Sequence, residues 1–214
     1  MRSFREIGLD LTDKINHHRY DRFYPMFLDK FRNQEFNMLE IGIDQLGSFK
    51  LWSEYFPHAK IWGVDIDFKS SNDPRLTLII GDQSTKAGVE EISKNIPKCK
   101  VIIDDGSHVA EHQINTFHHL WKNNLEPGGV YIIEDIECTY WREDATCYGY
   151  PTGNLNIIDH FRGMLDALNQ EMSGYKNKLG IETITFAHNS IILTKSLDED
   201  LSLYNRPYRF SHSL

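Results

Sequence analysis

Acidic residues follow four short apolar runs of this 214-residue sequence, at positions where their side chains could bind a ligand. The runs span 60–64, 76–80, 101–103 and 130–133, and the residues that follow them are Asp65, Asp82, Asp104 with Asp105, and Glu134 with Asp135. A carboxylate in such a position can accept hydrogen bonds from the hydroxyls of a ribose. Aligned at neighbouring strand ends, these carboxylates favour a ligand that contains adenosine.

A fifth apolar run, 38–43, carries an acidic residue inside it and is followed by a glycine-containing loop. Glu40 and Gly42 lie in this run, and Gly47–Ser48 open the next amphipathic segment. Glycine lets the backbone approach a ligand closely, and the first turn of a helix offers free N–H groups. The spacing matches neither the dinucleotide fingerprint nor the P-loop. The segment therefore indicates either a ligand-binding loop or an ordinary turn.

Short apolar runs alternate with helical patterns between residues 38 and 135, and this order indicates the fold class. Val89, Ile92 and Ile96 repeat at helical spacing within 85–96, and a second helical pattern spans 109–125. Strands that alternate with helices imply crossover connections and hence an α/β fold with a mainly parallel sheet. Ligands of such sheets bind beyond the carboxyl ends of the strands, where the acidic residues of this chain fall.

The remainder of the chain predicts a connector, a helix and a hairpin. Residues 136–156 are rich in Tyr, Trp and Gly, which is compatible either with core packing or with a loop that covers a site. Apolar residues then repeat at helical spacing over 157–172. Two strand patterns, 183–186 and 190–194, are joined by the short turn 187–189 and predict a hairpin.

Length and composition predict one globular domain spanning 1–214. We expect an N-terminal helical segment over 1–35, a core over 36–195 and a tail over 196–214. Hydrophobic residues make up 40% of the chain and charged residues 25%, which is typical of globular proteins. The formal net charge of −8 argues against a nucleic-acid partner, since binding phosphates needs a basic face.

The cysteines and the hydropathy pattern indicate the cellular compartment in which the protein is expected. Cys99, Cys138 and Cys147 form no CxxC pair, so we expect neither a zinc ribbon nor a disulfide framework. The first residues lack an apolar core of a secretory signal, and no apolar run approaches 18 residues. We therefore expect a cytoplasmic protein without a membrane partner.

The motifs taken together resemble a known family. They are, in chain order, Thr12–Asp13–Lys14 with His17, His18, Tyr20 and Tyr24; Glu40 and Gly42 with Gly47–Ser48; Gly63–Val64–Asp65; Gly81–Asp82–Gln83–Ser84; Ile103–Asp104–Asp105–Gly106–Ser107–His108; and Pro127–Gly128–Gly129 with Ile133–Glu134–Asp135. Over about residues 10–195, this order resembles the class I S-adenosylmethionine-dependent methyltransferases. More narrowly, it is similar to the metal-dependent sugar O-methyltransferases of macrolide and tetracenomycin biosynthesis.

The resemblance implies a Rossmann-like seven-stranded sheet, mainly parallel, with helices on both faces and a C-terminal antiparallel hairpin. It implies S-adenosyl-L-methionine and Mg²⁺ as cofactors. The residues implied to bind S-adenosylmethionine are Glu40, Gly42, Ser48, Asp65, Asp82, Gln83 and Asp105, and those implied to bind the metal are Asp105, Glu134 and Asp135. His108 takes the place of the family's general base, and residues around Lys14, His18 and Tyr20 that of a segment covering the cofactor. Whether Asp104 or Asp105 is the ligand stays open. The 67–75 connection is too short for a crossover helix.

The chemistry of these residue types supports the same interpretation. Carboxylates that converge without a cation repel one another, and a hard divalent ion with oxygen ligands removes that cost. Hydroxyls of a vicinal diol could complete the coordination shell. A histidine three residues after Asp105 could then accept the hydroxyl proton. We expect the partner to be a sugar-containing small molecule or a glycan, and the resemblance also allows a homo-oligomer.

Other interpretations remain open at this stage. A metal-dependent enzyme that methylates a catechol-like phenol would also chelate a diol. A non-catalytic nucleoside-binding module would bind the cofactor without Mg²⁺. A nucleic-acid methyltransferase is disfavoured by the acidic balance. At the level of single residues, Asp104–Asp105 could be only a turn and helix cap, and His108 a solvated histidine at a helix start.

Overall fold

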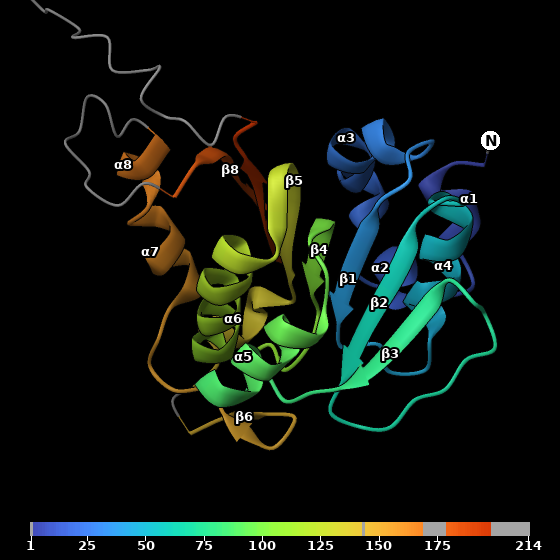
Figure 1. The fold of residues 1–214 in the computed structure, drawn as a ribbon. Helices are drawn as coiled ribbons and strands as arrows, with labels where there is room; N and C mark the ends of the chain where they lie inside the picture. The colour runs from blue at the N-terminus through green and yellow to red at the C-terminus, as the bar shows by residue number, and fades with distance from the viewer. Residues whose placement is uncertain (1, 143, 169–178, 198–214) are drawn as a thin grey trace, which may run out of the picture.

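The computed structural model describes residues 2–142, 144–168 and 179–197. Its centre is a seven-stranded sheet in the order β3-β2-β1-β4-β5-β9-β8 (Figure 1). The strands are β1 (Asn37–Ile41), β2 (Lys60–Asp65), β3 (Leu76–Ile80), β4 (Cys99–Asp104), β5 (Leu125–Glu134), β8 (Ile181–Ala187) and β9 (Ser190–Lys195). β1 to β5 are parallel, whereas β9 is antiparallel to both β5 and β8. The predicted fold class and C-terminal hairpin are confirmed.

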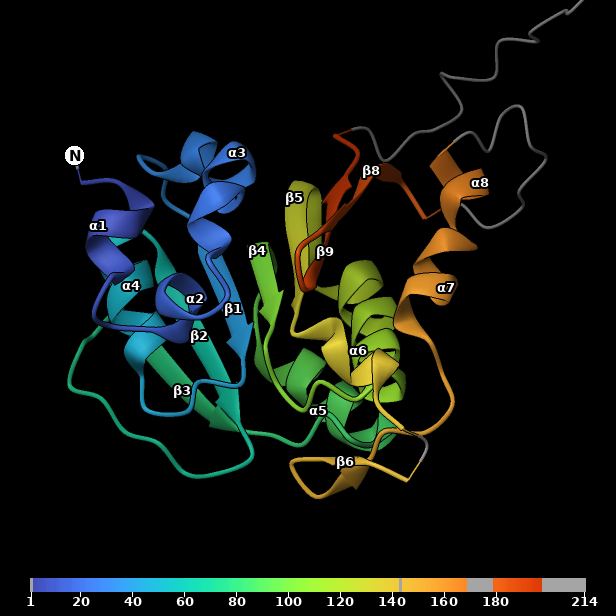
Figure 2. The same ribbon diagram turned by 180° about the vertical axis from the view of Figure 1, so that it is seen from behind.

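Helices cover both faces of the sheet, as Figures 1 and 2 show from opposite sides. One face carries α1 to α4 and the other carries α5 to α8. The bounds are α1 (Phe4–Gly8), α2 (Asp13–Asn16), η1 (Tyr20–Arg22), α3 (Tyr24–Leu28), η2 (Asp29–Phe31), α4 (Gly47–Tyr55), α5 (Lys86–Asn95), α6 (Ala110–Asn123), η3 (Ile136–Tyr140), α7 (Ile157–Arg162) and α8 (Leu165–Leu168). A small hairpin, β6 (Thr146–Cys147) with β7 (Tyr150–Pro151), lies near the carboxyl ends of the strands.

Two hydrophobic cores form because alternate residues of each central strand face opposite sides. On β4, Val101 and Ile103 pack with the N-terminal helices, while Ile102 packs with α5 and α6. On β5, Ile132 and Ile133 divide in the same way. Both faces are covered, so these strands are continuous apolar runs rather than alternating ones.

Two element boundaries differ from expectation. The predicted turn 127–129 lies inside β5, whose pairing with β4 shifts register between Cys99 and Val101. The predicted helix 157–172 is instead two short helices over its described part, with Gly163 at the C-cap of α7; residue 172 lies outside the described residues. Residues 66–75 form no helix, as their length indicated. Within the described ranges, no helix is long and apolar enough to cross a membrane.

Candidate active site

The carboxyl ends of β1 to β5 surround a cavity of about 680 Å³. Its volume lies in the range of small-molecule sites. Most of the predicted site residues line it: Gly42, Ser48, Asp65, Asp82, Gln83, Asp105, His108 and Asp135. Glu40 and Glu134 do not line it, and both side chains are almost completely buried. Acidic residues that are far apart along the chain therefore meet around one cavity, at the ends of neighbouring strands.

Gly42 allows the loop after β1 to lie directly against the end of β4. Its φ is +79°, and a Cβ at this position would overlap the carbonyl oxygen of Asp105. The Asp105 N–H donates to the Ile41 carbonyl oxygen at 2.9 Å, which fixes the contact. Only glycine meets both demands, the left-handed backbone and the close approach. Gly42 thus acts through its backbone geometry.

Asp65 ends β2 and holds the loop that follows β1. Its Oδ2 accepts the backbone N–H groups of Ile43 and Asp44, each at 3.1 Å, and its Oδ1 accepts that of Asp67 at 2.9 Å. The side chain is only partly buried and borders the cavity. Asp65 is therefore held in place by the backbone at the cavity border, with the Lys69 ammonium 3.8 Å from its Oδ1.

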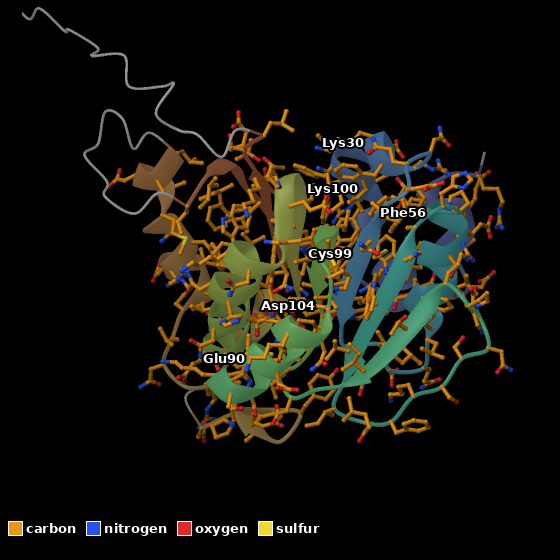
Figure 3. The ribbon with its side chains drawn as sticks, viewed as in Figure 1. Lys30, Phe56, Glu90, Cys99, Lys100 and Asp104 are labelled. Atoms are coloured by element: carbon orange, nitrogen blue, oxygen red, sulfur yellow. The ribbon has the colours of Figure 1, made fainter. Side chains whose placement is uncertain are left out.

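Gln83 and Asp104 form a buried link behind the cavity. The Gln83 Nε2 donates to Asp104 Oδ1 at 3.0 Å, and the Gln83 Oε1 accepts from the Ser107 N–H at 2.7 Å. Asp104 is fully buried, and this burial raises its pKa to about 6. It lies at the end of β4 farthest from Cys99 (Figure 3). Of the two adjacent aspartates, only Asp105 borders the cavity.

Glu40 anchors the start of α4. Its carboxylate accepts the Ser48 hydroxyl at 2.7 Å and the Trp52 indole N–H at 3.1 Å, and it lies 3.4 Å from the ammonium of Lys14. Burial raises the pKa of Glu40, although Lys14 and both hydrogen bonds oppose that rise. A direct contact of Glu40 with a cofactor stays a prediction, whereas its hold on Ser48 is observed.

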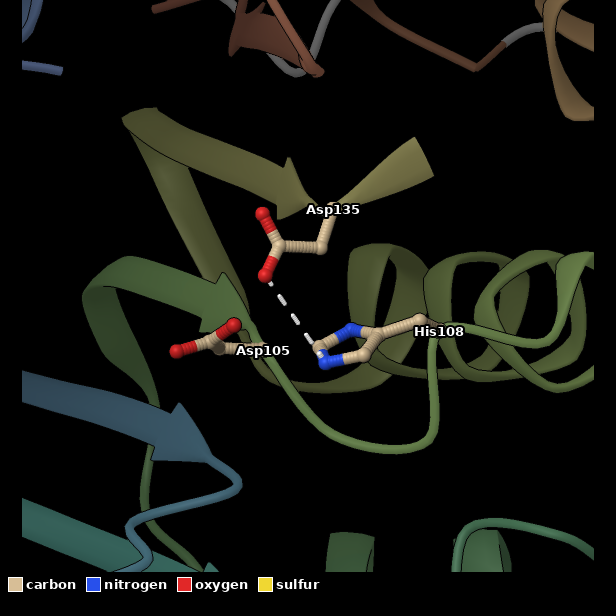
Figure 4. Close-up of side chains that lie close together, drawn as sticks. All are labelled: Asp105, His108 and Asp135. Atoms are coloured by element: carbon tan, nitrogen blue, oxygen red, sulfur yellow. Dashed lines mark ion pairs between the residues drawn. The ribbon is translucent and has the colours of Figure 1, made fainter. Parts of the chain in front are cut away.

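Asp105, His108 and Asp135 form the candidate metal-binding and catalytic group. Their donor atoms all lie within 4.8 Å of one another, and Figure 4 shows the three side chains together. The His108 Nε2 is 3.8 Å from Asp135 Oδ2. His108 and Asp135 both have positive φ, 57° and 53°. Such backbone is uncommon for residues other than glycine and concentrates at functional sites.

Glu134 is the other acidic residue at the end of β5, and both of its oxygens are engaged. Oε2 lies 2.6 Å from the Lys14 ammonium, and Oε1 accepts the Tyr24 hydroxyl at 2.6 Å. Burial raises the pKa of Glu134 well above its ordinary value, Lys14 opposes the rise, and Asp105 and Asp135 add to it. Its role as a metal ligand stays a prediction.

The N-terminal segment contacts the carboxylates of Glu40, Asp105, Glu134 and Asp135, which are called the acidic group below. Lys14 Nζ lies 2.6 Å from Asp105 Oδ2, and the Tyr20 hydroxyl donates to Asp135 Oδ1 at 2.6 Å. His18 Nδ1 is 3.3 Å from the same Asp135 oxygen. Burial disfavours the Lys14 ammonium, but the adjacent carboxylates outweigh it and hold the Lys14 pKa well above its ordinary value.

Sequence reasoning missed Asn189 as a site residue. It lies in the β8–β9 turn with a φ of 51°, and its Nδ2 donates to Asp135 Oδ1 at 2.9 Å. Its Oδ1 accepts the Glu137 N–H at 3.0 Å. The sequence indicates only a hairpin turn here, and the only available signal is that asparagine tolerates left-handed backbone.

The β6–β7 hairpin carries aromatic residues to the mouth of the site. The Tyr148 ring lies 5.3 Å from the His108 ring, and the Tyr150 ring 5.1 Å from that of His112. Tyr148 is 75% exposed and Tyr140 70%, so neither belongs to the core. Cys147 fixes the hairpin by packing on Cys138, with their sulfurs 2.9 Å apart. The aromatic connector therefore borders the site.

Comparison with known proteins gives consistent results, although no family model matches the chain. It is 35% identical over 161 residues to demethylmacrocin O-methyltransferase from Streptomyces fradiae, covering 67% of this chain and 40% of that protein. It is 31% identical over 176 residues to mycinamicin VI 2''-O-methyltransferase from Micromonospora griseorubida, covering 75% and 42%. The chain spans about two fifths of the length of these relatives.

Solved structures agree with the sequence relatives. The MycE methyltransferase from the mycinamycin biosynthetic pathway, in complex with Mg, SAH and mycinamycin VI, superposes with a TM-score of 0.80 at 27% identity. The match covers 92% of this chain and 55% of that one. The strand order and the strand-end cavity fit the same architecture. The chain therefore has the fold of the class I S-adenosylmethionine-dependent methyltransferases, and in sequence and structure it resembles their macrolide- and tetracenomycin-type sugar O-methyltransferases.

Proposed function

We propose that the protein is an S-adenosylmethionine- and Mg²⁺-dependent O-methyltransferase that methylates a hydroxyl of a sugar. The observation that carries the proposal is the grouping of Asp105, His108 and Asp135 at the floor of the strand-end cavity. Such a grouping provides oxygen ligands for a hard cation and a nitrogen base beside them. The relatives include an 8-demethyl-8-alpha-L-rhamnosyl tetracenomycin-C 2'-O-methyltransferase, a mycinamicin VI 2''-O-methyltransferase and an L-olivosyl-oleandolide 3-O-methyltransferase.

The wall of the cavity suits S-adenosylmethionine. Gly42 gives close backbone access after β1, and Ser48 lies in the first turn of α4. Asp65 is held at the cavity border, where the lone pairs that its backbone hydrogen bonds do not use could accept ribose hydroxyls. Asp82 borders the same cavity one strand farther along. We infer that the nucleoside lies across β1 to β3 and that its sulfonium end points toward Asp105.

The acidic group suits a divalent cation. Asp105 Oδ2 is taken by Lys14 and Asp135 Oδ1 by Tyr20; among the described residues the other oxygen of each accepts no hydrogen bond, and Asp135 Oδ2 lies 3.8 Å from His108 Nε2. Burial raises the pKa of Asp135, and the charge of Asp105 adds to the rise, so both disfavour the charged form of Asp135. A bound Mg²⁺ would favour that charged form and lower the barrier to deprotonating a coordinated hydroxyl.

His108 is the residue proposed to accept the proton. Its Nε2 faces Asp135, and its Nδ1 is buried without a hydrogen-bond partner among the described residues. In the proposed reaction the acceptor oxygen attacks the methyl carbon and the carbon–sulfur bond breaks. The hydroxyl proton passes to His108, and S-adenosylhomocysteine leaves. The negative charge of Asp135 stabilises the imidazolium that forms.

The exposed aromatic residues at the cavity mouth suit a sugar. Tyr148 and Tyr150 line the cavity, and the Tyr148 ring is tilted at 56° to that of His108 and leaves most of its surface open to solvent. An aromatic face in this position can cover the apolar face of a pyranose while its hydroxyls meet the acidic group. A catechol-type acceptor would use the same diol chelation, so substrate comparison separates the two.

Calorimetry tests the proposal. S-adenosylhomocysteine is titrated into the protein, and Mg²⁺ is then titrated into the resulting complex; we expect both to bind. Methyl transfer is next measured with a rhamnoside and with a catechol at equal concentration, and we expect the rhamnoside to react faster. Faster reaction of the catechol would instead support the phenol methyltransferase. Cofactor binding without Mg²⁺ binding or methyl transfer would support a non-catalytic module.

A further inference from the structure

Lys14 occupies a position that the proposed reaction does not use. Its side chain is 1% exposed, and its ammonium contacts three carboxylates, those of Asp105, Glu134 and Glu40. These carboxylates come from three neighbouring strands. Glu40 lies within β1, Asp105 directly follows β4, and Glu134 is the last residue of β5. The Lys14 ammonium of the N-terminal segment therefore forms ion pairs with three strands of the sheet.

The carboxylates of this group, if all are ionised, exceed the charge of the one ammonium that contacts them, and His18 and His108 are the other basic side chains beside it. Asp135 adds a fourth carboxylate, and Lys14 is the one lysine or arginine that contacts the four among the described residues. Removing the partner of a buried charge is strongly destabilising, because the remaining charges are left without compensation. The Lys14 ammonium is therefore the positive charge by which the protein itself offsets the charge of these buried carboxylates.

We propose that Lys14 is a positioning residue that acts as a tethered cation of the acidic group. It keeps the carboxylates of Asp105 and Glu134 assembled when no divalent cation is bound. A divalent cation then completes the neutralisation from the cavity side, where Asp105 and Asp135 each have one oxygen that accepts no hydrogen bond from the described residues. The second half of this inference rests on the proposed function, whereas the first half concerns the protein alone.

The same residue connects the acidic group to the cavity wall. Leu11, Thr12 and Asp13 directly precede Lys14 and line the cavity. Thr12 caps α2 by accepting the Lys14 N–H at 3.3 Å. A helix of only four residues has little stability of its own. The ion pairs of Lys14 therefore fasten this stretch of wall, and we expect loss of the ammonium to weaken cofactor binding as well.

The test is a thermal-unfolding comparison of Lys14→Met, Lys14→Arg, Glu134→Gln and the double variant Lys14→Met/Glu134→Gln. Lys122→Met, on the exposed face of α6, is the matched control. Each protein is measured in EDTA and in Mn²⁺. In EDTA we expect Lys14→Met to unfold roughly 10 °C below the parent. Lys14→Arg should recover part of that loss, and Lys122→Met should show none.

Two results distinguish a charge role from simple packing. We expect Mn²⁺ to raise the unfolding temperature of Lys14→Met more than that of the parent. We also expect Glu134→Gln to stabilise the Lys14→Met background while destabilising the parent. Equal losses in EDTA and Mn²⁺, with additive effects in the double variant, would overturn the proposal. If Lys14→Met does not fold in either condition, the double variant decides: folding supports the proposal and failure refutes it.

Failure of the proposed function gives a different pattern. A parent that binds neither Mn²⁺ nor S-adenosylhomocysteine would refute the methyltransferase reaction. The EDTA comparison and the double variant would still report on Lys14, because neither uses a ligand. The two conclusions can therefore fail separately.

Discussion

At the scale of single residues, His108 is the sharpest test of the proposed chemistry. Its Nε2 faces Asp135 and it makes no hydrogen bond that holds the cofactor wall. We expect His108→Gln to lower kcat by about 10²–10⁴-fold, the usual contribution of general-base catalysis. The affinity for S-adenosylhomocysteine should stay at the parent value. His119→Gln on α6 is the control, and a parallel loss of cofactor binding would contradict the assignment.

Asp135 and Asp65 should separate metal binding from cofactor binding. Asp135 belongs to the acidic group, while Asp65 holds the loop after β1. We expect Asp135→Asn to weaken Mn²⁺ binding at least roughly tenfold, as loss of a metal ligand does, and to leave the cofactor's affinity nearly unchanged. Asp65→Asn should do the reverse. Calorimetry on both variants measures each affinity, and identical profiles would argue against two distinct subsites.

The sequence alone identifies some residues of the candidate site and not others. The sequence places acidic residues at every relevant strand end, but it does not tell which adjacent carboxylate faces the ligand. Asp104 and Asp105 are such a pair, and only the pairing of Asp104 with Gln83 resolves it. Glu134 meets Tyr24 from 110 residues away in the chain. Contacts at such separations leave no local pattern that could reveal them.

At the scale of elements, the contact between α6 and α7 predicts a pH dependence of stability. His118 Nε2 and His160 Nε2 lie 3.0 Å apart, so at least one ring must be neutral. Burial lowers the pKa of both from 6.5, and His118 lowers that of His160 further. The folded state therefore binds fewer protons than the unfolded state, and stability is lost as pH falls through 6.5.

Urea unfolding at pH 5 and pH 7.5 measures this effect. We expect the parent to lose less than about 1 kcal/mol at the lower pH from this pair, because solvent screens both rings. His160→Gln should show a smaller loss, since it removes one titrating ring. The same pH dependence in His160→Gln and the parent would locate the effect elsewhere.

The β6–β7 hairpin should act on the acceptor rather than on the cofactor. Tyr148 is held beside His108 by the packing of Cys147 on Cys138. We expect Tyr148→Ala to raise the KM for the sugar several-fold, because about 0.5–1.5 kcal/mol of aromatic contact is lost. Tyr148→Phe should resemble the parent. A change in S-adenosylhomocysteine affinity equal to the change in KM would contradict this division.

The five parallel strands were predictable because each contains a short apolar run with an acidic residue or a glycine at its carboxyl end. On one face, α5 and α6 were predictable from their 3.6-residue spacing, whereas the same spacing over 157–172 did not show the break between α7 and α8. β6 and β7 are only two residues each, and η3 has no apolar period, so no pattern of useful length predicts them. Their positions depend on tertiary contacts such as that of Thr139 with the start of α7.

At the scale of the whole molecule, the described residues supply both the cavity wall and the acidic group, although the chain spans only about two fifths of its curated relatives. We therefore expect this chain to bind S-adenosylhomocysteine without another protein. Binding to the folded state alone adds about 2.7 kcal/mol at 100 times the dissociation constant. For a chain of this size, that corresponds to a rise in unfolding temperature of roughly 5–11 °C.

Thermal unfolding at increasing S-adenosylhomocysteine concentration checks this expectation, with adenosine and homocysteine added separately as controls. The rise should follow the logarithm of the ligand concentration, because each tenfold increase adds about 1.4 kcal/mol. Asp65→Asn should need a higher ligand concentration for the same rise in unfolding temperature, because its side chain would hold the loop after β1 less firmly. An unfolding temperature that does not respond to the ligand would mean that the cavity formed by this chain is not sufficient for cofactor binding.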